Sequence, residues 1–170
     1  MAVEHHKHEA AKEVKCLVIT VSDTRNEKTD KSGKLMIDFL EGEGHRVTGY
    51  KIVRDVQEEI RRTVVSGCQS EEVDAVLING GTGIAKRDVT IETVASLLEK
   101  EIVGFGELFR MLSYTEDIGS AAILSRAVAG VSEDTAVFST PGSSGAVRLA
   151  MKKLILPELG HVVREIKKDM

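Results

Sequence analysis

From about residue 15 onward, short runs of apolar residues alternate with longer stretches in which apolar and polar residues are mixed. The runs lie at 15–21, 45–53, 73–78, 126–131 and 135–139, and polar or glycine-containing residues follow each of them. Short runs rich in β-branched residues with such boundaries are typical of strands buried in a parallel sheet. The pattern therefore predicts five strands, the second of which shows only weak alternation.

Helices are predicted between these strands, because apolar residues recur there at helical spacing. The first is expected to start at Ser32 as its N-cap, to carry Leu35 and Leu40 on one face, and to stop at Gly42. The second is expected over 56–66. Both would pack an apolar face on the sheet.

The second half of the chain contains further helical signals. Asp88 and Thr90 are both possible N-caps for a third helix. Residues 101–125 suggest another helix, with three glycines expected to interrupt the stretch: Gly104, Gly106 and Gly119. After the last strand the chain is predicted to be helical, with Pro157 as a break or as the first position of a new helix.

This order of elements predicts one α/β domain over residues 15–170, in which a doubly wound, mostly parallel sheet carries helices on both faces. Residues 1–14 show no regular apolar pattern and are expected to form a disordered N-terminal tail. The histidines of that tail fit a solvated terminus better than a metal site.

Charge and composition exclude several classes of function. The 23 Lys and Arg residues against 27 Asp and Glu residues give a formal net charge of −4, so no nucleic-acid partner is expected. Apolar runs such as 16–21 are far shorter than the roughly 20 residues of a membrane span, so no membrane partner is expected either. The first 15 residues lack the apolar core of a secretory signal. We therefore expect a cytoplasmic protein in which Cys16 and Cys68 are free thiols.

Candidate chemistry lies in the segments that follow strands, which are 22–25, 54–55, 79–90 and 140–145. In such sheets ligands bind beyond the carboxyl ends of the strands, where loops converge. The richest segment begins with a glycine loop whose backbone N–H groups can approach an anion, and Lys86 and Arg87 add positive charge. This predicts a phosphate-bearing ligand, the alternative being a glycine-rich turn without one.

The common phosphate-binding motifs do not fit the sequence. A Walker A loop fails because leucine follows Gly33-Lys34, and a dinucleotide fingerprint fails because Lys86 stands where the third glycine belongs. Asp55 and Asp88 both follow strand ends. Such carboxylates can hold Mg²⁺ in phosphoryl transfer, or they can serve only as helix caps.

No side-chain nucleophile or zinc site emerges from the sequence. Neither His45 nor His161 follows a strand end, and Cys16 lies in the middle of a strand. The turn at 141–145 opens a helix and offers hydroxyl and N–H groups to a second anion, the alternative being that Ser144 serves only as its N-cap. The pattern indicates phosphate handling without covalent catalysis.

The glycine loop at 80–83, together with the Arg-Asp-x-Thr sequence at 87–90, resembles the signature of the MoaB/MogA family of molybdenum cofactor biosynthesis proteins. The segments 103–113, 124–131 and 141–143 are similar to further motifs of this family and occur in the same order. The similarity runs from about residue 15 to the last helix, and its second half looks closer to the MoaB branch.

The resemblance implies a doubly wound fold, assembly into a trimer or hexamer, and a role in making the pterin cofactor that carries molybdenum or tungsten. In active relatives the terminal phosphate of molybdopterin attacks the α-phosphate of Mg-ATP, and pyrophosphate leaves. The adenylylated pterin is then ready for metal insertion. The implied partners are molybdopterin, ATP and further copies of the chain, with Mg²⁺ as the cofactor.

The resemblance also implies roles for individual residues. Asp55 and Asp88 match the essential acidic positions of the family and are expected to be catalytic and to bind Mg²⁺. The remaining expected binding residues are Ser22 and Asp23 on the nucleotide side, Gly80, Gly81, Thr82, Gly83, Arg87 and Thr90 around a phosphate, and Ser125, Arg126, Gly142 and Ser143 around the pterin or its phosphate.

Two other functions stay open. Some MoaB-type proteins resemble MogA without its adenylylation activity, so the alternative is a non-catalytic molybdopterin-binding or assembly protein of the same pathway. The same domain also occurs in competence-damage-inducible proteins, which act on nucleotides and carry additional sequence.

Overall fold

The computed structural model describes residues 11–170, so the histidine-containing start of the predicted tail lies outside the described residues. At the end of that segment, the Ala11 N–H donates to the Gly160 carbonyl (3.3 Å) and Val14 is fully buried in the core. Residues 11–14 therefore pack on the domain.

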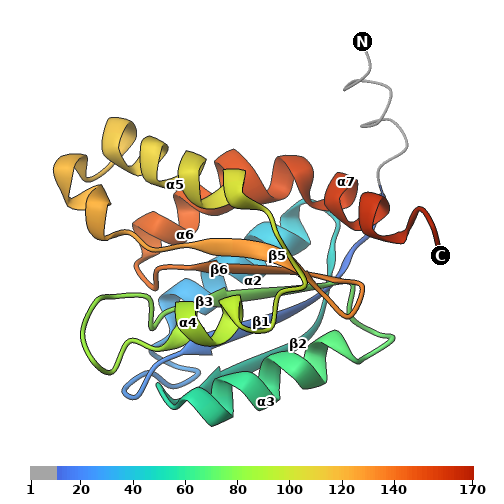
Figure 1. Ribbon diagram of the computed structural model, residues 1–170, viewed down its shortest axis with the longest axis horizontal. Coiled ribbons are helices and arrows are strands. Elements are labelled where there is room, and N and C mark those ends of the chain that lie inside the picture. Colours follow the sequence, from blue (N-terminus) through green and yellow to red (C-terminus); the bar gives the residue numbers. More distant parts are fainter. Residues whose placement is uncertain (1–10) are drawn as a thin grey trace.

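Six strands form one mixed sheet in the order β2-β1-β3-β6-β5-β4 (Figure 1). Their bounds are β1 Lys15–Val21, β2 Arg46–Val53, β3 Ala75–Asn79, β4 Lys100–Glu101, β5 Val128–Ser132 and β6 Thr135–Thr140. The four strands β2, β1, β3 and β6 are parallel, which confirms the predicted doubly wound, mostly parallel sheet. The two-residue edge strand β4 was not predicted.

The strand β5 runs antiparallel to both of its neighbours, β6 and β4. A two-residue turn joins β5 to β6, and both of its residues, Glu133 and Asp134, have positive φ (50° and 59°). Turns with two positive φ values match the twist of paired antiparallel strands. This tight turn leaves no room for the crossover helix that a parallel connection needs.

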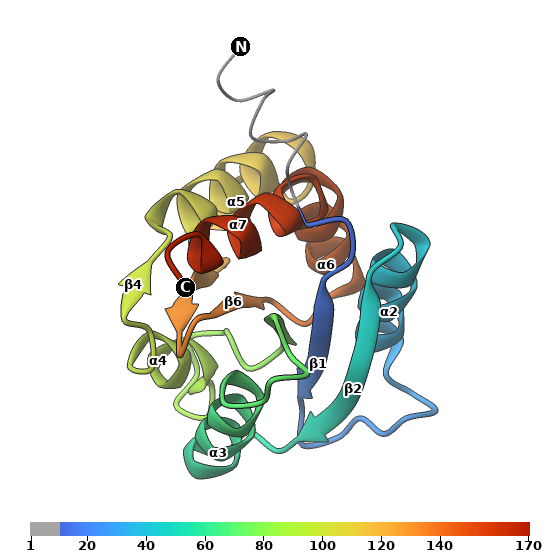
Figure 2. The same cartoon turned by 90° about the vertical axis from the view of Figure 1, so that its right-hand side faces the viewer.

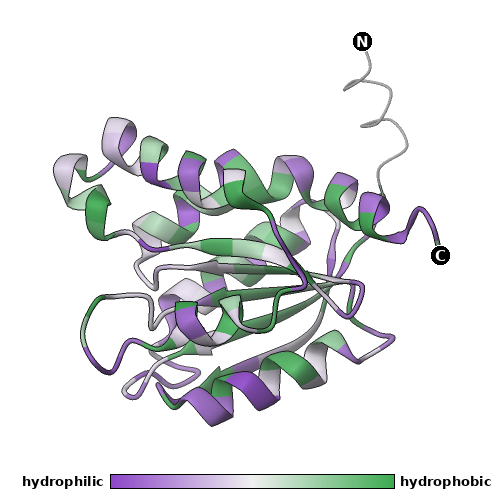
Figure 3. Ribbon diagram, viewed as in Figure 1, coloured by the Kyte–Doolittle hydropathy of each residue, from purple (hydrophilic) through white to green (hydrophobic). Residues whose placement is uncertain are grey.

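Helices cover both faces of the sheet, as predicted (Figure 2). One face carries α2 (Lys31–Gly42), α5 (Val103–Glu116), α6 (Ser144–Ala150) and α7 (Leu156–Lys167), and the other carries α3 (Gln57–Cys68) and α4 (Thr90–Ala95). The helices turn their apolar residues toward the sheet and their polar residues outward (Figure 3). Within residues 11–170, no helix has the length and apolar character needed to cross a membrane.

The core consists of two layers because successive strand residues point to opposite faces. In β1, Val18 packs under α2 and α6, whereas Ile19 packs against α3. Both are fully buried, and burying such a side chain contributes about 1.5–3 kcal/mol. The aliphatic residues of the strands thus form the core on both faces of the sheet. The polar residues lie in the loops that follow the strands.

The N-cap of α2 differs from the prediction. Asp30 caps the helix, because its Oδ1 accepts the Gly33 N–H (3.0 Å). Ser32 lies within the first turn instead, and its hydroxyl donates to the Gly142 carbonyl (2.7 Å). The serine is therefore used for a tertiary contact rather than for capping.

The start of α4 also differs from the prediction, since neither of the two expected caps fills that role. Val89 occupies the N-cap position and Thr90 is the first helical residue. The carboxylate of Asp88 accepts the Ala85 N–H (2.9 Å) and so closes the preceding loop. For Asp88, the alternative of a helix cap is wrong.

Two of the glycines that were expected to interrupt residues 101–125 lie inside α5. Gly106 allows this helix to approach the sheet, since a β-carbon there would lie 2.7 Å from the Ala127 carbonyl oxygen. Gly119, with a φ of 60°, does separate α5 from a short 3₁₀ helix, η1 (Gly119–Leu124). Pro157 occupies the first turn of α7, which follows α6 through a π-helical turn, η2 (Met151–Ile155).

Both cysteines are buried free thiols, as expected. Burial raises the pKa of the Cys16 thiol to about 12 and that of the Cys68 thiol to about 11. Because the thiolate is the nucleophilic form, neither residue is a nucleophile at neutral pH.

Candidate functional site

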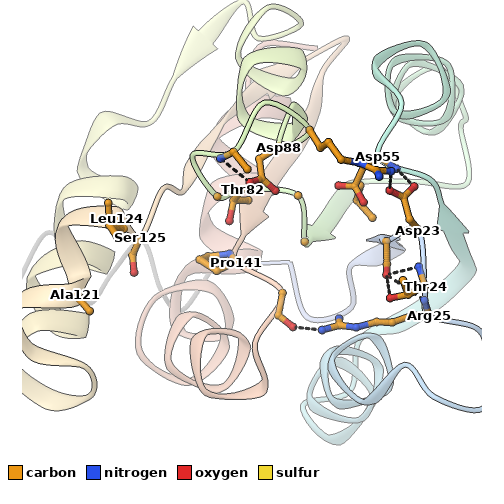
Figure 4. Close-up of a pocket in the computed structure, with 18 of the residues that line it drawn as sticks. Asp23, Thr24, Arg25, Asp55, Thr82, Asp88, Ala121, Leu124, Ser125 and Pro141 are labelled. Carbon is orange, nitrogen blue, oxygen red and sulfur yellow. Dashed lines mark hydrogen bonds and ion pairs between the residues drawn. The ribbon is translucent and has the colours of Figure 1, made fainter.

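A pocket of about 810 Å³ opens at the carboxyl ends of β1, β3 and β6, where the predicted segments meet (Figure 4). Eleven of the predicted site residues line it: Ser22, Asp23, Asp55, Gly80, Gly81, Thr82, Gly83, Arg87, Asp88, Ser125 and Gly142. The structure therefore brings these residues together. Three predicted residues are not part of the lining, namely Thr90, Arg126 and Ser143.

Backbone rather than side chains forms the floor of the pocket. Gly80 and Gly81 have φ values of 98° and 67°, which side-chain-bearing residues rarely adopt. A β-carbon at Gly80 would lie 2.2 Å from the Val21 carbonyl oxygen, and one at Gly142 would lie 3.0 Å from the Cα of Gly80. The two glycine turns are therefore in contact, and only glycine fits at this junction.

Acidic side chains gather at one end of the pocket (Figure 4). The Asp55 N–H donates to Oδ1 of Asp23 (3.1 Å), and Asp23 also forms an ion pair with Arg87. Asp88 lies against Gly83, where a β-carbon would be 2.5 Å from its Oδ2. The glycine thus leaves room for the carboxylate beside the loop.

These carboxylates affect one another electrostatically. Burial, followed by the charges of Asp23 and Asp88, raises the pKa of Asp55, although Arg87 partly offsets the effect. Concentrated negative charge of this kind favours a bound cation. The acidic end is therefore suited to a divalent ion that arrives with its own anionic ligands.

The donor set fits Mg²⁺ only in combination with further oxygen ligands. In the part of the chain that the structure describes, no three His, Cys, Asp or Glu side chains converge to hold a metal ion. Mg²⁺ usually keeps several waters and binds one or two carboxylates together with substrate phosphates. Asp55 and Asp88 match that smaller set.

Thr90 lies beneath the glycine loop rather than in the pocket. Its N–H donates to the Gly81 carbonyl (3.1 Å), its side chain is fully buried, and its hydroxyl oxygen has no hydrogen-bond partner. A β-carbon added at Gly81 would lie 2.1 Å from this hydroxyl oxygen and 2.8 Å from Oδ1 of Asp55. Thr90 therefore supports the loop from below.

Arg126 also supports the glycine loop from outside the pocket. Its Nε donates to the Thr82 carbonyl (3.0 Å), its Nη2 donates to the Gly83 carbonyl (2.5 Å), and the guanidinium forms an ion pair with Glu92. Because Arg126 binds the carbonyl groups of both Thr82 and Gly83, it holds these two carbonyls toward itself and so fixes the conformation of the loop.

Ser143 is the N-cap of α6, because its Oγ accepts the Ala146 N–H (3.2 Å). Ser144, which the sequence suggested as a possible cap, is the first residue of the helix. The hydroxyl of Ser143 is thus occupied within the chain.

The wall opposite the acidic end comes from residues that the sequence did not identify. Ala121 and Leu124 lie there beside Ser125 (Figure 4), and Ile118, from the same segment around η1, also lines the pocket. A short 3₁₀ helix has no extended periodic pattern, so only its position after α5 could have indicated this wall. The pocket is consequently acidic at one end and apolar at the other.

Comparisons with known proteins agree with this architecture. Residues 17–161 match a family model described as "Probable molybdopterin binding domain". Molybdenum cofactor biosynthesis protein B of Bacillus subtilis is 68% identical over 169 residues, which cover 99% of each chain.

Solved structures show the same similarity. The crystal structure of a molybdenum cofactor biosynthesis protein B has a TM-score of 0.91 at 62% identity, covering 94% of this chain and 99% of that one. The tungsten cofactor synthesizing protein MoaB from Pyrococcus furiosus has a TM-score of 0.83 at 39% identity, covering 93% and 99%. The chain therefore belongs to the MoaB family of molybdenum cofactor biosynthesis proteins.

Proposed function

We propose that the protein transfers an adenylyl group from Mg-ATP to the terminal phosphate of molybdopterin. An oxygen of that phosphate would attack the α-phosphorus of ATP, the bond from this phosphorus to the bridging oxygen would break, and pyrophosphate would leave. The observation that carries the proposal is a pocket with a backbone floor, two carboxylates beside it, and no Cys, His or Lys among the residues that line it. Such a site fits a reaction whose nucleophile belongs to the substrate.

The acidic end would hold the nucleotide. Asp55 and Asp88 would bind Mg²⁺ together with the phosphates of ATP, and Ser22 and Asp23 would line the same side of the pocket. When bound, the ion supplies positive charge that stabilises the phosphates and the leaving group. Arg87, which pairs with Asp23, would add a further positive charge close by.

The floor would hold phosphate through backbone N–H groups. Positive φ at Gly80 and Gly81 allows the backbone of this loop to approach an anion closely. Fixed donors of this kind stabilise developing charge without reorganising during the reaction. Thr90 and Arg126 would act indirectly, because they hold the loop in shape from below and from outside.

The pterin would occupy the other end of the pocket. Ser125 and Gly142 would bracket the pterin or its phosphate, whereas Ser143 supports this end indirectly as the N-cap of α6. The apolar side chains of Ile118 and Leu124 suit the face of a flat ring system. The two substrates would then meet over the glycine floor, which gives the proximity that group transfer requires.

The direct test is to incubate the purified protein with molybdopterin and Mg-ATP and to measure pyrophosphate and adenylylated pterin. Asp88→Asn is expected to abolish product while the protein stays folded, and Asp38→Asn, on the exposed side of α2, serves as the control. Unchanged turnover in Asp88→Asn would remove this carboxylate from the mechanism. Pterin binding without pyrophosphate release would favour the non-catalytic binding or assembly role.

We also propose that the protein acts as a homo-oligomer, a trimer or a hexamer. A set of exposed large apolar side chains, here called the α5–η1 face, comes from these two elements and the link between them: Val103, Leu108, Met111, Tyr114, Ile118, Ile123 and Leu124. Apolar surface gathered in this way marks contact sites between proteins. Its continuity with the pocket wall is consistent with a subunit contact close to the site.

A further inference from the structure

A second centre of charge lies at the Gly142 side of the pocket, across the glycine loop from Asp88 (Figure 4). Arg25 lines the pocket there, and its Nη2 donates to the Gly142 carbonyl (2.9 Å; Figure 4). The turn that carries Arg25 is fixed as well, because Oγ of Ser22 accepts the Arg25 backbone N–H (3.1 Å). This arginine is therefore held at both its backbone and its side chain.

The acidic partner of Arg25 lies behind it rather than in the pocket. Oδ1 of Asp30 is 3.6 Å from Nη1 of Arg25, and the side chain of Asp30 is fully buried. The Gly33 N–H and the Tyr50 hydroxyl both donate to this carboxylate. A β-carbon at Gly33 would lie 2.2 Å from Oδ2 of Asp30, so the carboxylate fits closely against the helix start.

Asp30 is ionised at neutral pH. Burial by itself would raise its pKa, but hydrogen bonds from Thr20, Tyr50 and Gly33, together with the charge of Arg25, lower the pKa overall. A buried carboxylate with several donors has little freedom to move, so it fixes the charge that faces it. The guanidinium of Arg25 thus rests on a rigid support.

The hydrogen-bonding capacity of Arg25 is mostly unused. Among residues 11–170, the guanidinium forms one hydrogen bond although it carries five N–H donors. Its Nη1 is buried beside Asp30, so the donors left for a ligand are those on Nε and Nη2. Its side chain is 32% exposed. Arg87 differs, because its charge is already paired within the pocket with Asp23 and its side chain is 75% exposed.

We propose that Arg25 binds the phosphate monoester of the pterin ligand, and that Asp30 is the positioning residue that aims it. The proposal rests on the proposed pterin ligand but not on adenylyl transfer. Arg25 contacts the Gly142 turn, whereas Asp88 lies across the glycine loop from it (Figure 4), so ATP with its Mg²⁺ and the second phosphate would occupy separate places. A guanidinium that engages two terminal oxygens leaves the third free to attack.

The test compares the affinity for molybdopterin with the affinity for the same pterin after enzymatic removal of its phosphate. Wild-type protein is expected to prefer the phosphorylated form at least tenfold, and Arg25→Gln is expected to lose that preference. Arg61→Gln, which removes a guanidinium that donates to Ser96 far from the pocket lining, should keep it. No preference in the wild type, or an undiminished preference in Arg25→Gln, overturns the proposal.

This comparison needs no turnover, so absence of adenylyl transfer would leave its outcome unaffected. Arg25→Lys keeps the charge but loses the two-pronged geometry, and it is expected to retain an intermediate preference. If a thermal melt shows that Arg25→Gln is unfolded, Arg25→Lys takes its place in the comparison. A preference equal to that of the wild type in the lysine variant would contradict bidentate binding.

Asp30→Asn tests the positioning role separately. Asparagine is also a good N-cap, so α2 keeps its start while the charge that faces Arg25 is lost. The phosphate-dependent part of the affinity is expected to fall several-fold, while the affinity for the dephosphorylated pterin stays the same. An equal loss for both ligands would show a merely structural role and would overturn the positioning assignment.

Discussion

Gly81 lies directly against Thr90, so that a β-carbon at Gly81 would be 2.1 Å from the threonine hydroxyl oxygen. The backbone at Gly81 is also left-handed, with a φ of 67°. Gly81→Ala is therefore expected to destabilise the protein by about 2 kcal/mol or more and to reduce product formation. Urea unfolding measures the first effect and pyrophosphate release the second.

Gly42→Ala is the matched control for that change, because a β-carbon at Gly42 would have no neighbour within 4 Å. Gly42 is the last residue of α2, so alanine there should alter the free energy of unfolding by less than about 1 kcal/mol. Equal unfolding curves for the two variants would contradict the crowding argument.

Asp55 is expected to reduce the stability of the unliganded protein at neutral pH. Its pKa is raised in the folded state, so the stability that it contributes is present below about pH 4 and is lost as the pH rises through the raised pKa. Asp55→Asn should therefore raise the melting temperature at pH 7, by about 2 °C, while product formation is lost.

The decisive measurement is the difference in melting temperature between Asp55→Asn and the wild type as a function of pH. The difference should be smallest in acid, where Asp55 is protonated. A variant that melts below the wild type at pH 7 would contradict the assigned cost of burying the Asp55 charge beside Asp23 and Asp88.

Asp74 is expected to stabilise the fold in the opposite pH range. It accepts the Lys15 N–H (2.9 Å) and forms an ion pair with Lys167 of α7. Burial would raise its pKa, but these partners lower it overall, so its contribution is present above about pH 4 and is lost as the pH falls through the lowered pKa. Asp74→Asn should cost about 2 kcal/mol at pH 7.

Urea unfolding at a series of pH values checks this contribution, since the Asp74→Asn variant should lose less stability on acidification than the wild type. Glu72→Gln is the control, because Glu72 is exposed and its nitrogen–oxygen distance to Lys15 is 3.8 Å. Exposed pairs of this kind contribute little. If Asp74→Asn and Glu72→Gln lower the free energy of unfolding by similar amounts, the ion pair between Asp74 and Lys167 of α7 does not stabilise the fold as proposed.

The α5–η1 face is expected to hold the subunits together. Met111 is 54% exposed on this face, and Met111→Glu would place a charge in any contact that it forms. The wild type should elute as an oligomer and the variant as a monomer of 18.5 kDa, as measured by light scattering after gel filtration.

Met170→Glu, at an exposed methionine outside that face, should leave the oligomer intact. A monomeric wild type would contradict the proposed assembly, and an oligomeric Met111→Glu would move the contact to another surface.

The sequence predicted the parallel part of the sheet because β1, β3 and β6 are buried on both faces and read as continuous apolar runs, whereas the edge strand β2 gave only a weak alternation. The acidic and glycine residues of the pocket were predicted for a related reason: polar residues directly after such runs must lie at the same edge of the sheet. Val18 and Ile19, for example, indicate a buried strand, and Ser22 then marks its end.

The direction of β5 could not be predicted in this way, because an apolar run does not show which way a strand points. The turn at Glu133 and Asp134 decides it, and its sequence is not one of the glycine-containing pairs that usually indicate a tight hairpin. The choice of Asp30 over Ser32 as N-cap depends on a contact from Ser32 to Gly142, which is more than 100 residues away in the sequence.

Ile118 and Leu124 belong both to the α5–η1 face and to the wall of the pocket. Any subunit that covers this face would therefore change the surroundings of the bound pterin. Thermodynamic linkage makes such an effect reciprocal: if assembly tightens pterin binding, then pterin tightens assembly by the same factor. The apparent affinity for the pterin should consequently depend on the protein concentration, so a titration measured on dilute protein would describe a different binding equilibrium from one measured on the assembled form.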